Sequence, residues 1–343
     1  MQRDAEDATV DAAERWRRLG ALVAGVDTAT ALTAYESAFR LQPRDFWTCV
    51  ELSRLRQCIG DLRGSEEAAA AAQRVATTDR EVLVAYGEIG NVLVAQGDGP
   101  GALAAYRRDL AIAEALAARD PSNTEWQRDL SVSHDRIGNV LVAQGDGPGA
   151  LAAYRWGLAI REALAARDLA NTQWQRDLSV SHNKIGDVLV AQGDGPGALA
   201  AYRRGLAIRE ALAARDPANT EWQRDLSVSH DRIGNVLVAQ GDGPGALAAY
   251  RRGLAIREVL AARDPANTQF QTDVAVSCAK LGTLDHGQNW EARQRYLLRG
   301  KELLLTLQSA GRLMANQDWI EWFNEQLATV ETFDNSDGKT RGR

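Results

Sequence analysis

The sequence has little of what builds disulfide-linked, membrane-embedded or secreted proteins. Among its 343 residues only Cys49, Cys58 and Cys278 are cysteines, which is too few for a disulfide framework and includes no CxxC pair. No apolar run approaches 18 residues, and the charged N-terminus lacks the apolar core of a signal peptide. We therefore expect a cytoplasmic protein with no membrane partner.

Lysine and net positive charge are also scarce. Of the 40 basic residues only Lys184, Lys280, Lys301 and Lys339 are lysines, and the net charge is −6. No global basic field is present to hold a phosphate backbone, so we expect no nucleic-acid partner. Richness in alanine, glycine and arginine is typical of a GC-rich, bacterial genome. Aromatic residues make up only 6% of the chain, which favours thin helix–helix contacts over one thick core.

What the sequence does contain is a repeat. Gly90, Gly138, Gly186, Gly234 and Gly282 recur every 48 residues, and the last copy is degraded. The segments 122–169 and 218–265 differ only at Ser122/Ala218, Trp156/Arg252, Ala163/Val259 and Leu169/Pro265. A fixed period of this length indicates a stack of identical supersecondary units, each of which buries its apolar side against the next.

Each repeat reads as two helices. Thr124 and Gln127 have the spacing of a capping box, and the first helix that they open carries an apolar stripe from Trp126 to Leu141. Gly145 ends this helix, and Pro148 opens a second one. The second helix has two apolar stripes and therefore two neighbours, which predicts stacked helical hairpins.

The hairpin resembles the tetratricopeptide repeat. Ile137-Gly138, Leu141, Gly145, Ala150 and Tyr154 have the spacing of that family, although the closing proline falls seven residues late and each helix has gained about two turns. Tyr154-Arg155 followed by Leu158-Ala159-Ile160-Arg161-Glu162 is similar to kinesin light chain and related bacterial long-helix repeats. The resemblance implies an all-α fold, a right-handed α-solenoid (superhelix) of stacked hairpins.

Four segments are expected along the chain. Residues 1–79 should hold N-terminal helices in two short, about 34-residue units, because Leu19-Gly20, Ala31, Tyr35, Ala38 and Pro43 follow the ordinary pattern. Residues 80–306 should hold the long units. A capping helix over 307–331 should carry Leu313, Ile320, Phe323, Leu327 and Val330, and residues 332–343 should form a disordered polar tail.

No constellation for catalysis is expected. His134, His182 and His230 occupy the same repeat position, so stacking should hold them too far apart for one metal ion. Consecutive Ser133, His134 and Asp135 point in different directions on a helix and form no triad. The GDGPG loops lack the ending of a phosphate-binding loop. We therefore expect a non-enzyme without cofactor or metal.

A polar side of the first helix is the predicted binding surface. In the resembled family that side lines a concave groove that grips peptides or partner helices. Its residues here are Arg128, Asp135 and Asn139, then Arg176, Asn183 and Asp187, then Arg224, Asp231 and Asn235. The Asp and Asn exchange places in the second set, which favours a hydrogen-bonding ladder. A merely solvated face remains the alternative.

Trp156 is a second candidate for an anchor, on the convex side. It stands where other copies have Arg108, Arg204 and Arg252, so we expect it to be partly exposed. The predicted function is a non-catalytic scaffold for a protein or peptide partner. The resemblance further implies the sensor or adaptor part of a bacterial signalling or defence system. The alternative is a structural array that self-associates into homo-oligomers or fibres.

Overall fold

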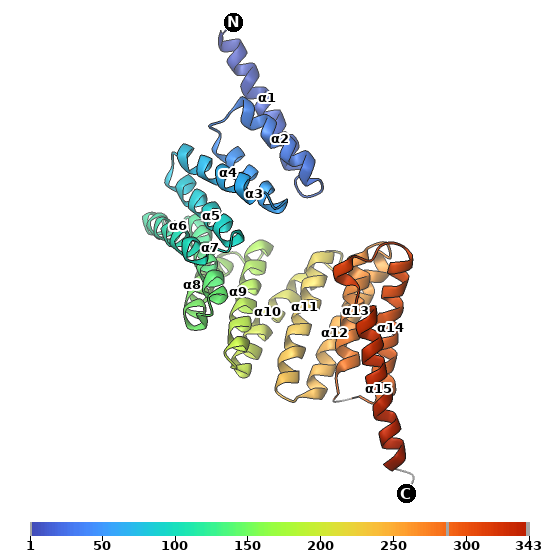
Figure 1. Cartoon of the computed structure of the whole chain (residues 1–343). Coiled ribbons are helices and arrows are strands. Elements are labelled where there is room, and N and C mark those ends of the chain that lie inside the picture. Colours follow the sequence, from blue (N-terminus) through green and yellow to red (C-terminus); the bar gives the residue numbers. More distant parts are fainter. Residues whose placement is uncertain (1, 286–287, 341–343) are drawn as a thin grey trace. The chain divides into compact units, whose positions relative to one another are not determined.

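The computed structural model describes residues 2–285 and 288–340, which form fifteen α-helices and one 3₁₀ helix (Figure 1). They divide into two compact units, residues 1–168 and 169–343. The first unit contains α1 (Gln2–Val23), α2 (Thr28–Leu41), α3 (Phe46–Cys58), α4 (Leu62–Val75), α5 (Asp79–Ala95), α6 (Gly99–Arg119), α7 (Thr124–Ala143) and α8 (Gly147–Arg167). The second contains α9 (Thr172–Ala191), α10 (Gly195–Arg215), α11 (Thr220–Ala239), α12 (Gly243–Arg263), α13 (Thr268–Thr283), α14 (Trp290–Ser309), η1 (Ala315–Gln317) and α15 (Ile320–Thr340).

Consecutive helices form hairpins, as the repeat predicts. In the first unit α1 pairs with α2, α3 with α4, α5 with α6 and α7 with α8; in the second, α9 pairs with α10, α11 with α12 and α13 with α14. Hairpins also stack on their neighbours, through α6 on α7 in the first unit and through α10 on α11 and α12 on α13 in the second. Each unit is therefore an α-solenoid of helical hairpins.

The predicted capping boxes of the long repeats are wrong. The N-cap of α7 is Asn123, whose side chain accepts hydrogen bonds from the backbone N–H groups of Glu125 and Trp126. Asn171, Asn219 and Asn267 cap α9, α11 and α13 in the same way. Asparagine is preferred over threonine as an N-cap residue, and here it takes the N-cap one residue before the threonine. A capping box does form at Thr78 and Glu81 of α5.

The close approach of paired helices depends on one glycine per hairpin. A Cβ atom on Gly138 of α7 would lie 2.4 Å from the ring of Tyr154 on α8, closer than atoms can approach. Gly90, Gly186 and Gly234 face Tyr106, Tyr202 and Tyr250 in the same manner. The turn glycine Gly145 has a φ of +78°, which a side chain would strain. The sequence analysis predicted that Gly145 ends the first helix, whereas the contact between the glycine and the tyrosine ring is seen only in the structure.

The C-terminal end of the array is covered. Phe323, Leu327 and Val330 of α15 pack on Leu297 and Leu304 of α14, and Leu313 lies beside them in the connecting segment. The covering helix begins at Ile320 rather than at residue 307, because the turn at Gly311 (φ +65°) ends the preceding helix. It continues through 332–340, which the sequence analysis expected to be disordered; this stretch has no proline to end a helix. Residues 341–343 lie outside the described part of the chain.

Helix length changes near the expected boundary at residue 79. The helices α2, α3 and α4 have 14, 13 and 14 residues, whereas α5 has 17 and α6 has 21. The two compact units divide the chain elsewhere. The first ends at residue 168 and the second begins at residue 169, inside the long repeats.

Candidate functional site

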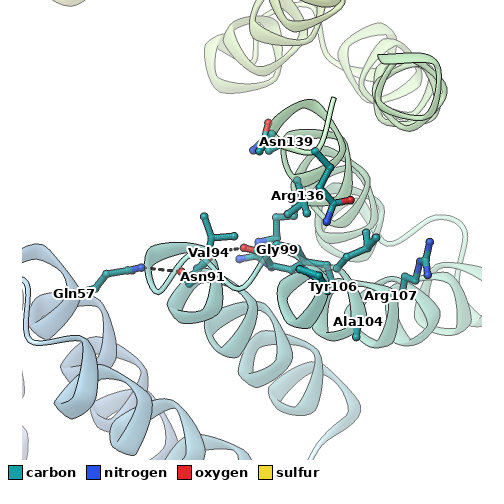
Figure 2. Close-up of a pocket in the computed structure, with 15 residues that line it drawn as sticks. Gln57, Asn91, Val94, Gly99, Ala104, Tyr106, Arg107, Arg136 and Asn139 are labelled. Atoms are coloured by element: carbon teal, nitrogen blue, oxygen red, sulfur yellow. Dashed lines mark hydrogen bonds between the residues drawn. The ribbon is translucent and has the colours of Figure 1, made fainter. Parts of the chain in front are cut away.

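A pocket of about 1050 Å³ opens in the first unit, where the hairpin α5–α6 meets α7 (Figure 2). Its wall comes from the C-terminal ends of α5 and α7 and from the first turns of α6, and Gln57 of α3 closes one side. A second pocket, of about 600 Å³, lies in the second unit between α9–α10 and α11. Its lining residues are Asp187, Val190, Gly193, Gly195, Pro196, Tyr202, Arg232, Asn235, Val236, Ala239 and Gln240. For each of these residues, the residue 96 positions earlier lines the first pocket. The two pockets are therefore equivalent sites, two repeats apart.

The GDGPG loop shapes the rim of each pocket. Gly97 and Gly193 take a left-handed turn, with φ of +80° and +79°, that ends one helix and allows the next to start. Asp98 then caps α6 by accepting a hydrogen bond of 2.9 Å from the backbone of Gly101. A Cβ on Gly99 would lie 3.1 Å from the Nε2 atom of Gln144, so the glycine leaves room for a glutamine from the following hairpin. The loop therefore serves as the rim of a protein pocket.

Amide groups and arginines dominate the first pocket. The Gln57 amide donates a 2.9 Å hydrogen bond to the backbone oxygen of Asn91, and the Tyr106 hydroxyl donates one of 2.8 Å to the Asn91 side chain (Figure 2). The only charged residues among those that line this pocket are Arg107 and Arg136. Burial raises the pKa of Tyr106 to about 12, so its hydroxyl stays a donor at neutral pH. The site is polar, rich in hydrogen-bonding groups and positively charged.

The second pocket balances its charge internally. Asp187 stands where the first pocket has Asn91, and it accepts a 2.6 Å hydrogen bond from Tyr202 and two of 2.7 Å from Arg232. Burial, followed by the contact with Asp187, raises the pKa of Tyr202. Asp187 therefore neutralises Arg232 within the second pocket. The two pockets share their geometry, and the first differs in charge through the exposed Arg107, whose equivalent does not line the second.

Arg136 of the first pocket has a different partner. Its guanidinium lies 3.1 Å from a carboxylate oxygen of Asp109, a completely buried residue of α6. Burial raises the pKa of Asp109 to about 6, against the opposing effect of Arg136. The later hairpins have Gly157, Gly205 and Gly253 at the position of Asp109.

Three of the nine predicted groove residues line these pockets, namely Asn139, Asp187 and Asn235. Arg176 and Arg224 instead join successive first helices, since Arg176 pairs with Glu221 and, at 3.5 Å, with Asp225, and Arg224 pairs with Asp273 at 2.6 Å. Arg80 makes the same bond to Asp129 at 3.0 Å. Arg128 is exposed on α7. The arginines that pair in this way hold the stack together.

The prediction that the remaining three residues face a groove is wrong. Asp135, Asn183 and Asp231 are buried between the helices of their own hairpins. Asp135 pairs with Arg161 at 2.9 Å, and Asp231 with Arg257 at 2.8 Å. The sequence analysis did not predict that Arg161 and Arg257 are buried. Both lie between the two apolar stripes of the second helix, where a long charged side chain is not expected. Glycine at 157, 205 and 253 was the available signal, since it clears space beside these groups.

The pocket residues that the sequence analysis missed are the tyrosine, the arginine, the glutamine and the exposed valine of each pocket. They are Tyr106, Arg136, Gln144 and Val94 in the first pocket, and Tyr202, Arg232, Gln240 and Val190 in the second. Each recurs with the repeat period, but periodicity alone does not show which positions of neighbouring hairpins share a cavity. That depends on how the hairpins stack.

Trp156 is exposed, as expected, with 66% of its surface accessible. Its ring stacks on His134 of α7, with centroids 6.4 Å apart and planes 20° from parallel. Burial lowers the pKa of His134, and likewise that of His182 and His230. In the part of the chain that the structure describes, no three His, Cys, Asp or Glu side chains gather where they could hold a metal ion.

The repeats match known proteins. Residues 82–121 match the family model of the tetratricopeptide repeat, and solved structures of such repeats match the fold. Residues 82–121 thus match a tetratricopeptide repeat, and the chain has the fold of a tetratricopeptide repeat solenoid. A signal transduction ATPase with numerous domains (STAND) from Pyrococcus horikoshii, which has a tetratricopeptide repeat sensor, has a TM-score of 0.63 at 11% identity. That match covers 89% of this chain and 41% of the ATPase.

BtubC (BKLC) from P. vanneervenii has a TM-score of 0.52 at 18% identity, with 75% of this chain and 92% of that one covered. The nearly identical kinesin-light-chain-like repeats of Podospora anserina have a TM-score of 0.49 at 16% identity, with 65% and 98% covered. The two structures with TM-scores above 0.5, at 11% and 18% identity, establish the fold alone. A search of curated protein sequences found no match. Within the described residues, no helix is both long and apolar enough to cross a membrane.

Proposed function

We propose that this chain is a non-catalytic scaffold that binds an extended segment of a partner protein in the repeated pockets. The observation that carries the proposal is the recurrence of the same eleven lining positions in two separate hairpin junctions. A repeated site suits a repeating ligand, and an extended peptide backbone repeats its donors and acceptors along its length.

The chemistry of the lining supports a peptide ligand. Asn139 and Gln144 present amide groups that can donate to and accept from a peptide backbone. Val94 is half exposed and, with Pro100 and Leu103, offers an apolar wall for one side chain. Arg107 is exposed and adds a positive charge. The first pocket should therefore prefer a segment in which an apolar residue lies next to a carboxylate, whereas the neutral second pocket should tolerate uncharged neighbours.

Two finer proposals follow, one from the structural comparison and one from the exposure of Trp156. The sensor of the STAND ATPase supports a role for this chain as the sensing or adaptor part of a bacterial signalling or defence system, with a cytoplasmic protein or peptide as its partner. The exposed Trp156 supports a second anchor outside the pockets, because a tryptophan that is largely accessible can contribute a large contact area at low entropic cost.

Selection of peptides from a random phage-displayed library on the immobilised protein tests the proposal. We expect enrichment of peptides with an acidic residue beside an apolar one, and weaker binding to the Arg107→Glu/Gln144→Ala variant by roughly 10-fold or more, since hydrogen bonds to charged groups contribute about 1.5–3 kcal/mol each. Arg251→Glu is the matched control, because Arg251 is the exposed equivalent on α12 and lines neither pocket.

Undiminished binding of the selected peptides by the Arg107→Glu/Gln144→Ala variant would exclude the first pocket as their site. Repeating the measurement with Trp156→Ala then tests the alternative anchor. If Trp156→Ala loses binding and the pocket variant does not, the peptide-binding site lies on the surface around α8 and not in the first pocket.

A further inference from the structure

The hairpin α5–α6 carries its buried carboxylate on the opposite helix from the hairpin that follows. In α7–α8 the carboxylate is Asp135 of the first helix, and Gly157 of the second helix lies against it. In α5–α6 the two residue types exchange places, because Asp109 stands on the second helix and Gly87 on the first. The exchange keeps a buried carboxylate between the paired helices but changes the arginine that reaches it.

Asp109 takes its arginine from the neighbouring hairpin. In α7–α8 the buried Arg161 belongs to the same hairpin as its carboxylate, whereas α6 has Ala113 at that position. Instead, Nη1 of Arg136, on α7, donates a 3.1 Å hydrogen bond to Oδ2 of Asp109. Gly87 leaves this path open, since a Cβ atom there would lie 2.2 Å from the same Nη1 atom. Because Arg136 also lines the first pocket (Figure 2), one guanidinium joins the buried carboxylate to that pocket.

The Asp109 carboxylate is completely buried, and its two oxygens differ in their surroundings. Oδ2 accepts the bond from Arg136, whereas Oδ1 has no hydrogen-bond partner among the residues that the structure describes. Burial favours the neutral form of such a group, so it raises the pKa of Asp109 to about 6, against the opposing effects of Arg136 and the Ser133 hydroxyl. Asp109 can therefore gain a proton under mildly acidic conditions.

The other charged groups nearby are engaged with partners of their own. The helices α5 and α7 pack on α6. On α7, the charge of Asp129 raises the pKa of Asp109 further, but Asp129 is paired at 3.0 Å with Arg80 of α5. On α5, Glu88 pairs at 2.6 Å with an arginine of α3. A proton on Asp109 therefore acts chiefly on Arg136, the charged group that it contacts directly.

Three aromatic titratable side chains lie on the same helices. Tyr106 of α6 has the Arg136 guanidinium 5.8 Å from its ring centroid, and burial raises its pKa to about 12. His134 of α7 stacks on a tryptophan of α8, and burial lowers its pKa. Tyr86 of α5 has an arginine of α6 over its ring. Each of the three is thus occupied by a contact other than Asp109.

We propose that Asp109 is a positioning residue for the first pocket, which binds anionic peptide segments more tightly when a proton on Asp109 frees Arg136 for the ligand. As in the proposed function on which this rests, the ligand is a peptide segment with an acidic residue. While Asp109 is ionised, it neutralises the guanidinium, and a ligand carboxylate that approaches Arg136 meets a second negative charge. Once Asp109 is protonated, Arg136 joins Arg107 in attracting the ligand.

Binding and protonation then favour each other. A ligand carboxylate beside Arg136 opposes the ionised form of Asp109, so it raises the pKa of Asp109 above its value in the free protein. The affinity for the ligand therefore rises as the pH falls toward and through 6, and binding near neutral pH takes up protons from the solvent.

The second pocket provides an internal comparison. Its Arg232 pairs with Asp187, a half-exposed residue of α9 that also lines the pocket, and Gly205 stands at the position of Asp109. A ligand of this pocket meets an ion pair that is open to solvent. Its affinity should therefore change little between mildly acidic and neutral pH.

Nuclear magnetic resonance of the full chain tests the coupling without a ligand. With carbon-13 in the aspartate carboxyl groups and nitrogen-15 in arginine, the Asp109 signal should titrate near pH 6, and the Arg136 Nε signal should shift with the same midpoint. Asp109→Asn and Arg136→Lys assign the two signals by their loss. An Arg136 signal that stays constant while Asp109 titrates, or an Asp109 that remains ionised at pH 5, overturns the proposal.

Calorimetric titration with a capped peptide that carries glutamate beside leucine tests the effect on binding. Wild type should bind roughly 10-fold more tightly at pH 5.5 than at pH 8, and it should take up protons on binding at pH 6.5. Asp109→Asn, which cannot ionise, should bind tightly at both pH values without proton uptake. Asp135→Asn is the matched control, because it removes the buried carboxylate of the next hairpin and should keep the pH dependence. The same peptide with glutamine in place of glutamate should bind equally at both pH values.

The binding measurement separates two kinds of failure. Affinity for the glutamate peptide that is equal at pH 5.5 and 8, or that depends on pH equally in Asp109→Asn, overturns the proposal and leaves the proposed function standing. A peptide that binds wild type at neither pH contradicts the proposed function, and the proposal about Asp109 falls with it.

Discussion

At the scale of single residues, this protein varies a buried ion pair from one hairpin to the next. Arg161 and Arg257 pair with Asp135 and Asp231, but the equivalent Arg209 meets Asn183. Arg209 is 7% exposed and is held by neutral groups, among them the Ser229 hydroxyl at 2.8 Å and the backbone oxygen of Asp225 at 2.9 Å. Burial lowers the pKa of Arg209, although an arginine remains charged. Arg209 is thus a buried cation that faces the neutral Asn183 where Arg161 and Arg257 face a carboxylate.

Asn183→Asp should stabilise the protein. The new carboxylate would stand where Asp231 lies in the next hairpin, and it would neutralise a guanidinium that is already desolvated. We expect a gain of about 1–2 kcal/mol, measured as a shift of the urea or thermal unfolding midpoint. The reverse change Asp231→Asn should lower the midpoint, because it leaves Arg257 in the situation of Arg209. A lower midpoint for Asn183→Asp would contradict the argument.

Asp109 should make stability depend on pH. Burial raises its pKa from the ordinary value of 3.8 to about 6 in the folded protein, so the folded state holds the proton more tightly than the unfolded state. The contribution is therefore fully present below about pH 4 and is lost as the pH rises through 6. Relative to Asp109→Asn, wild type should lose about 2–3 kcal/mol of stability between those limits. Unfolding midpoints of both proteins at several pH values measure this; parallel curves would contradict it.

At the scale of helices, each hairpin is fixed by the contact of a glycine with a tyrosine ring. Gly138→Ala should destabilise the protein by about 1–3 kcal/mol, because the added methyl group would overlap Tyr154 and push α7 from α8. Gly25→Ala is the control, since an added Cβ there meets no atom within 4 Å. Thermal unfolding of the two variants gives the comparison, and equal stability would show that the tyrosine ring moves aside freely.

At the scale of the whole molecule, the array should respond locally to damage. In a stack of repeats each hairpin depends on its neighbours, so Gly138→Ala should speed amide hydrogen exchange in α7, α8 and the adjacent α5–α6 hairpin first. Exchange in α12 and α13 should be unchanged. Mass spectrometry of exchanged peptides resolves the two regions. Because the repeats are nearly identical, the peptides compared must contain Trp156 of α8 or Val259 of α12, which identify their repeat. Uniform acceleration along the chain would argue against a linear array.

Much of this architecture could be read from the sequence because the determinants are local. A turn needs a glycine with positive φ at Gly145, a second helix can begin at Pro148, and the period of 48 repeats both. Those requirements act within one hairpin, where distance along the chain limits distance in space. The exposure of Trp156 followed in the same way, from its place on a face that otherwise carries arginine.

The tertiary structure decided which polar residues are available to a partner. Arg176, Asn183 and Asp187 lie on the same side of one helix, yet Arg176 bonds to the next first helix, Asn183 is buried against α10, and only Asp187 lines a pocket. Spacing along a helix gives the direction of a side chain but not what the neighbouring helix presents to it. Pockets form where two hairpins meet, and the register of that meeting is set by packing between residues about 50 positions apart. The sequence alone therefore determined the hairpin, whereas the stacking of hairpins decided the site.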